Sequence, residues 1–166
     1  MKYLYATAFI FMSFHVSAIP NNYLNDFVSL FDKYCYSFKG SPNKTVSYLE
    51  KRGYKINPDF DAYEIFIDGI DYAITPQIDD CTTDVLLSHD EGPLFTFEQI
   101  DRILTQKFNL TLVSSRSFQD IALNNKDTKI QQRDYSDGAG HGYRLLYPSD
   151  NQDSYYMTFT IEWQDI

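Results

Sequence analysis

The chain has few of the residues that usually carry catalysis or metal binding. Its 166 residues include two cysteines, one tryptophan and three histidines. It has no Cys-x-x-Cys pair, no His-Glu-x-x-His run, no Walker loop and no Gly-x-Ser-x-Gly elbow. The signatures of zinc enzymes, P-loop NTPases and α/β-hydrolases are therefore absent from the sequence, and we expect neither a cofactor nor a metal.

Long apolar runs are also missing, except at the N-terminus. Lys2 gives a short positive start, an apolar run extends from Tyr3 to Phe14, and Val16-Ser17-Ala18 supplies the small residues that signal peptidase reads. The run is shorter than the roughly 20 residues that a membrane-spanning helix needs. We therefore predict a signal peptide over residues 1–18, a single domain over residues 19–166, and export to the periplasm or the cell exterior without membrane insertion.

Positive charge is scarce. The chain has 14 Lys and Arg residues against 23 Asp and Glu residues, a formal net charge of −9, and removal of Lys2 with the signal peptide makes it −9 − 1 = −10. Such a protein repels phosphate backbones, so we expect no nucleic-acid partner. The charge is compatible with a basic protein as partner, but more commonly such a charge simply keeps an exported protein soluble.

The two cysteines, Cys35 and Cys81, are predicted to form a structural disulfide, as an even pair in an exported protein usually does. The bridge closes a loop of 81 − 35 = 46 residues. Such a loop is expected to stabilise the fold by about 4 kcal/mol. A reactive thiol or a metal site has no support, because no histidine lies near either cysteine in the sequence.

The strongest local pattern is a hairpin around Asp68-Gly69. This dipeptide favours a two-residue type I′ turn, in which both residues have positive φ. Side chains alternate between the faces of a strand, so the large apolar groups of both strands fall on one face. The register that this turn sets pairs Ile67 with Ile70, Ile65 with Tyr72 and Tyr63 with Ile74.

The other elements follow from apolar periodicity. Steps of three and four residues predict helices over 24–38, ending at Gly40, and over 42–53, and Thr96 with Gln99 forms a capping box before a third helix. Alternation predicts further strands at 81–87, 110–113, 143–147 and 155–163. The fold class is therefore α+β: an antiparallel sheet of about five to six strands, with an N-terminal helix pair and one central helix packed on one face.

The alternation fails between Gln119 and Gly142, a polar stretch that ends in Gly138-Ala139-Gly140-His141-Gly142. Long irregular loops in compact domains are often functional, so we expect a binding surface here. The glycines also fit a simple turn. The candidate binding residues are Tyr135, Asp137, His141 and Tyr143. By contrast, Asp79, Asp80 and Asp84 are interpreted as a solvated edge.

The leading hypothesis is a non-enzymatic binding, inhibitor or accessory protein that acts through protein–protein contact. One alternative is an exported hydrolase that uses His141 with a nearby carboxylate such as Asp137. A second alternative is a carrier of small ligands, with a pocket between sheet and helices lined by Tyr and Phe. Two segments, beginning at Asn43 and Asn109, match the acceptor pattern for N-glycosylation.

Overall fold

A computed structural model of the chain describes residues 22–39, 41–89, 92–150 and 152–162. The predicted signal peptide at residues 1–18 and the predicted helix end at Gly40 lie outside these ranges. Within them, no helix is both long enough and apolar enough to cross a membrane.

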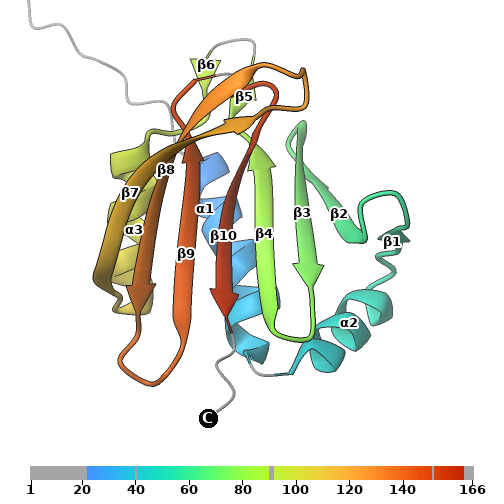
Figure 1. The fold of residues 1–166 in the computed structure, drawn as a ribbon. Coiled ribbons are helices and arrows are strands. Elements are labelled where there is room, and N and C mark those ends of the chain that lie inside the picture. Colours follow the sequence, from blue (N-terminus) through green and yellow to red (C-terminus); the bar gives the residue numbers. More distant parts are fainter. Residues whose placement is uncertain (1–21, 40, 90–91, 151, 163–166) are drawn as a thin grey trace, which may run out of the picture.

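The fold is α+β, with one antiparallel sheet of eight strands in the order β1-β2-β3-β4-β10-β9-β8-β7 (Figure 1). Its strands are β1 Ile56–Asn57, β2 Ala62–Ile67, β3 Ile70–Pro76, β4 Asp80–Leu86, β7 Thr111–Ile121, β8 Asp127–Ser136, β9 Gly142–Pro148 and β10 Tyr156–Glu162. A separate two-stranded ribbon joins β5 Ser88–His89 and β6 Gly92–Pro93. The prediction of five to six strands was too low, because it omitted β1 and treated β8 as part of a loop.

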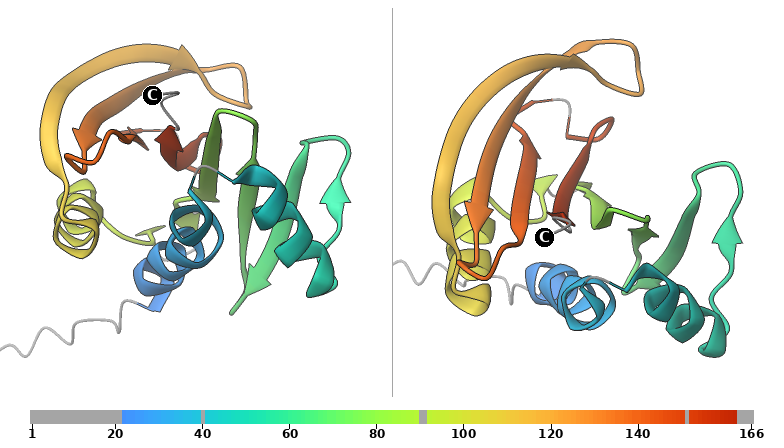
Figure 2. Two further views of the ribbon diagram at one scale, coloured as in Figure 1. Left: turned by 90° about the horizontal axis from the view of Figure 1, so that it is seen from below. Right: turned by 60° about the horizontal axis from the view of Figure 1, so that its bottom comes forward.

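The helices lie on one face of the sheet (Figures 1 and 2). They are α1 Asn22–Leu30, α2 Pro42–Lys51 and α3 Phe97–Phe108, and α1 continues through η1 Phe31–Cys35, a π-helical turn, and η2 Tyr36–Phe38. The predicted capping box at Thr96 and Gln99 is confirmed. Phe31 joins these elements: its ring centroid lies 5.3 Å from that of Phe108 in α3 and 4.4 Å from that of Phe159 in β10.

The predicted hairpin is confirmed in turn and register. Asp68 and Gly69 have φ values of 49° and 88°, as a type I′ turn requires. The strand pairs are Tyr63 with Ile74, Ile65 with Tyr72 and Ile67 with Ile70. Their side chains face the helices, and all but Ile67 are buried there.

The stretch from Gln119 to Gly142 is not the irregular loop that the sequence predicted. It contains the end of β7 and all of β8, which form a long hairpin, and only residues 137–141 connect β8 to β9. The apolar alternation is lost for two reasons. β7 is an edge strand that is exposed along nearly its whole length, and two of the buried positions of β8 hold the polar residues Thr128 and Gln132.

The tip of the β7–β8 hairpin bends over the sheet face opposite the helices (Figure 2). Two contacts hold it there: the Leu123 amide donates to the Ser154 carbonyl oxygen at 2.7 Å, and the Tyr155 hydroxyl donates to Asp120 Oδ2 at 2.7 Å. Ile130 is fully buried yet lies outside the main core, which is consistent with packing beneath the bent hairpin. We call this side of the sheet the concave face.

Cys35 in η1 and Cys81 in β4 form the predicted disulfide, with Cα atoms 5.4 Å apart and both residues fully buried. The bridge fixes the first helical segment to the centre of the sheet.

We expect the Cys35→Ala/Cys81→Ala variant to lose about 3–4 kcal/mol of unfolding free energy in chemical denaturation, mostly because its unfolded chain has more conformational freedom. Reductant should destabilise the wild type and leave the variant unchanged; equal stability of the variant and the oxidised wild type would refute this role.

Candidate functional site

Three of the four predicted site residues meet at Asp137, in the loop between β8 and β9. Asp137 Oδ2 lies 2.9 Å from His141 Nδ1 and accepts a hydrogen bond from the Tyr143 hydroxyl at 3.1 Å. The same oxygen pairs with Lys39 Nζ at 3.3 Å, while Oδ1 accepts the Ala139 and His141 amides. The fourth residue, Tyr135, is directed elsewhere, because its hydroxyl donates to Asp101 in α3.

Asp137 therefore holds the β8–β9 loop together, because it accepts hydrogen bonds from several of the loop's own groups. Burial raises the pKa of its carboxyl, but the hydrogen bonds from Ala139, His141 and Tyr143 outweigh burial and hold the pKa well below its ordinary value. A hollow of about 240 Å³ lies beside His141. The one serine hydroxyl in its lining, on Ser136, already accepts the Gly138 amide. The geometry therefore supports loop closure more directly than nucleophilic catalysis.

A second candidate site lies on the concave face, where strand pairing lines side chains up in two rows. The first row runs from β2 to β7 through Glu64, Ala73, Asp84, Thr158, Leu146, Gln132 and Arg116. The second runs from β3 to β7 through Thr75, Thr82, Thr160, Arg144, Asp134 and Ser114. Each row crosses from an apolar pocket near β2, β3 and β4 to a polar network on β7, β8 and β9.

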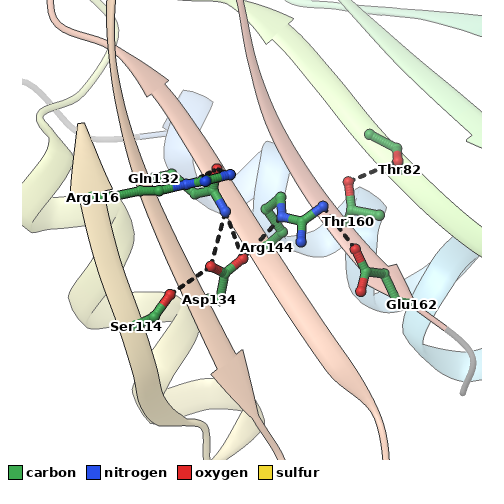
Figure 3. A network of polar contacts seen from close by, with 8 residues as sticks. All are labelled: Thr82, Ser114, Arg116, Gln132, Asp134, Arg144, Thr160 and Glu162. Carbon is green, nitrogen blue, oxygen red and sulfur yellow. Dashed lines mark hydrogen bonds and ion pairs between the residues drawn. The ribbon is translucent and has the colours of Figure 1, made fainter. Parts of the chain in front are cut away.

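In the polar network every charge has a partner (Figure 3). Asp134 accepts hydrogen bonds from Ser114 at 2.7 Å and Gln132 at 2.9 Å, and it pairs with Arg144 at 2.9 Å. Arg144 also pairs with Glu162 at 3.0 Å. Although burial raises the pKa of the Asp134 carboxyl, these donors outweigh burial and lower it. This half of the concave face is thus electrostatically satisfied.

The other half forms a pocket of about 360 Å³ beneath the hairpin tip. Its floor comes from β2, β3, β4 and β10, and its rim carries large apolar side chains. Phe60, Ile121 and Leu123 are 65%, 57% and 66% exposed. Exposed apolar groups gathered around one hollow are typical of a binding site. The lining consists of Phe60, Ala62, Glu64, Ala73, Thr75, Asp84, Ile121, Leu123, Tyr155, Tyr156 and Thr158.

Asp84 is the unusual group on the pocket floor. It is partly buried at the centre of the sheet, between Ala73 on β3 and Thr158 on β10. Within the described ranges no residue donates a hydrogen bond to its carboxylate or forms an ion pair with it. Burial, and secondarily the charge of Asp80, raise the pKa of Asp84 to about 7. A strongly raised pKa in a pocket is a marker of a functional site.

The interpretation of Asp79, Asp80 and Asp84 as one solvated edge was therefore wrong for Asp84. Only Asp79 is exposed, at the turn between β3 and β4. The alternation of Cys81, Thr83 and Val85 places Asp84 on the opposite face of the strand, but the sequence does not indicate that a distant hairpin covers this face. The described residues contain no cluster of His, Cys, Asp or Glu suited to a metal ion.

The raised pKa of Asp84 predicts an unusual dependence of stability on pH. Because the folded state holds this proton more tightly than the unfolded state, unfolding free energy falls as pH rises from about 4 to about 7, by at most about 4 kcal/mol. Asp84→Asn should therefore exceed the wild type in stability by about 2 kcal/mol at pH 8, less than that limit because the carboxylate is partly exposed.

Chemical denaturation of both proteins at pH 8 and pH 5 measures this difference, which should shrink at the lower pH. Asp79→Asn, which removes an exposed charge from the turn before β4, is the matched control and should change little at either pH. A wild type more stable than Asp84→Asn at pH 8 would mean that the carboxylate has a partner.

The position of Asp137 predicts that it matters more for stability than His141 does. Asp137→Ala removes the common acceptor of several charge-assisted hydrogen bonds and should cost about 2–3 kcal/mol at pH 7, against less than about 1 kcal/mol for His141→Ala. Since the pKa of Asp137 is lowered in the folded state, its contribution should decline as pH falls below about 4. Denaturation curves that rank the two variants in the opposite order would contradict this role.

Comparisons with known proteins assign no family to this fold. No protein-family model, curated protein or solved structure matches the chain. A functional assignment must therefore be argued from the contacts of the Asp137 loop and of the concave face.

Proposed function

We propose that this protein acts by binding, and that the pocket beneath the β7–β8 hairpin is its binding site. One contrast carries the proposal. Asp134 and Asp84 lie on the same face of one sheet, but Asp134 accepts hydrogen bonds from three side chains while Asp84 accepts none among the described residues. A buried polar group without a partner is costly, and a bound ligand that supplies the missing donor removes that cost.

The rim supports the same proposal. Three large apolar side chains remain exposed around a floor of small residues such as Ala73 and Thr158. Covering the rim would bury apolar area at roughly 25 cal/mol per Å². The group that enters is therefore expected to combine an apolar body with a hydrogen-bond donor, whether it belongs to a small molecule or to a side chain of a partner protein.

This proposal keeps the expected class of function, binding, and moves the site. The protein–protein surface predicted at Gln119–Tyr143 contributes Ile121 and Leu123 to the pocket rim. The carrier hypothesis placed a pocket between sheet and helices, where Phe31, Phe108 and Phe159 instead pack in ring contact. The hydrolase hypothesis gains the contact between Asp137 and His141, but the same carboxylate oxygen is shared with Lys39 and Tyr143. Export and a basic partner remain proposals.

Blocking the pocket tests this proposal. Three probes share one apolar body and differ in one group: naphthylmethylamine, naphthylmethanol and naphthoate. We expect at least one to bind the oxidised protein in ligand-observed NMR, and Ala73→Leu to reduce that binding at least about tenfold because leucine fills the pocket floor. Ala139→Leu, in the exposed β8–β9 loop, is the matched control and should bind like the wild type. Binding lost in Ala139→Leu and kept in Ala73→Leu would instead place the site near His141.

A further inference from the structure

We infer that the ligand of this pocket is an organic cation, an ammonium or amidinium group attached to an apolar body, and that its charge lies between Asp84 and Glu64. The inference rests on the proposed function and adds the chemical class of the ligand. Glu64 and Asp84 are the two carboxylic acids of the pocket lining, and the lining contains no Lys, Arg or His. An anionic ligand would meet two carboxylates and no positive charge there.

The register of the sheet determines how the two carboxylates are placed. Glu64 pairs with Ala73, and Ala73 pairs with Asp84, so the acids lie in one row with only a methyl group between them. Two strand spacings separate their Cα atoms by roughly 10 Å. A compact cation over Ala73 therefore lies within reach of both side chains. The Asn57 side-chain amide, from β1 on the other side of β2, donates to Glu64 Oε1 at 3.0 Å, so Oε2 is the oxygen of Glu64 left for the ligand.

Aromatic side chains complete a cation site. Phe60, Tyr155 and Tyr156 line the same pocket, and the faces of such rings attract cations that have lost part of their hydration. Tyr156 is adjacent to the acids: burial first, and then the charges of Asp84 and Glu64, raise the pKa of its hydroxyl. The hydroxyl of Tyr155 is directed away, to Asp120, where it secures the hairpin tip.

The rest of the chain is consistent with this charge preference. Elsewhere on the concave face, the cationic side chains of Arg116 and Arg144 are already bound to Gln132, Asp134 and Glu162. They are therefore occupied and do not neutralise Asp84. The formal net charge of −9 also attracts cations from solution.

The three naphthalene probes test the charge preference at pH 8, above the raised pKa of Asp84. We expect the oxidised protein to bind naphthylmethylamine at least about tenfold more tightly than naphthylmethanol, and naphthoate more weakly than either. Asp84→Asn should bring the amine to within about threefold of the alcohol, since it removes the charge and keeps the shape. Glu64→Gln should weaken the amine less, because Glu64 is exposed, and the control Asp79→Asn should bind like the wild type.

Each other outcome has a distinct meaning. If amine and alcohol bind equally, or if Asp84→Asn keeps the preference for the amine, the cation inference is wrong while the proposed binding site stands. If naphthoate binds best, the pocket selects anions and the inference is likewise wrong. If none of the three probes binds the wild type, or if Ala73→Leu binds them all unchanged, the proposed function itself fails.

Discussion

The pocket on the concave face depends on the two contacts that hold the β7–β8 hairpin over the sheet. Helices cover one face of the eight strands, so the other face would be open without the hairpin. The Leu123 amide and the Tyr155 hydroxyl join the tip to the end of the β9–β10 connection, at Ser154 and Tyr155. These two hydrogen bonds convert an open sheet face into a pocket, and they place Ile121 and Leu123 at its rim. The layer that covers the concave face is thus formed by two strands of the same sheet, β7 and β8.

The concave face handles charge in two ways. On β8 and β9, Asp134 and Arg144 exchange hydrogen bonds and ion pairs with their neighbours across the strands. On β4, Asp84 lies between Ala73 and Thr158, which offer it neither a charge nor a hydrogen bond. As a result, the pKa of the Asp134 carboxyl is lowered, whereas the pKa of the Asp84 carboxyl is raised. The register places Ser114 and Arg144 beside Asp134 but Ala73 and Thr158 beside Asp84.

Sequence reasoning succeeded where a local pattern and burial agree. Asp68-Gly69 fixed both the turn and the register of β2 and β3, Thr96 with Gln99 marked the start of α3, and the two cysteines implied their bridge. It failed for β8, because this strand belongs to the bent hairpin and buries the polar residues Thr128 and Gln132 at positions where the alternation calls for apolar ones. It also placed the candidate site by loop character, which led to Asp137 and His141 and away from Asp84.

The pocket on the concave face could not be found from sequence for a geometric reason. Its lining draws on residues from Phe60 to Thr158, and the strands that bring them together are ordered by long-range pairing between β4 and β10. No short motif records such a juxtaposition. The one local indication is Asp84, which alternates with the buried residues of β4 and is therefore predicted from sequence to face solvent. The covering hairpin turns that ordinary position into an unfavourable one.

The energetic cost of Asp84 is itself an argument for function. An Asn or a Thr at this position would keep the shape of the sheet without a partly buried charge, so the fold does not need the carboxylate. Local features that oppose stability and have no structural compensation are concentrated at functional sites. Asp137 is the opposite case: its carboxylate is fully used in holding Ala139, His141, Tyr143 and Lys39. Of the two aspartates, the one that the structure leaves unsatisfied is the one that a ligand can satisfy.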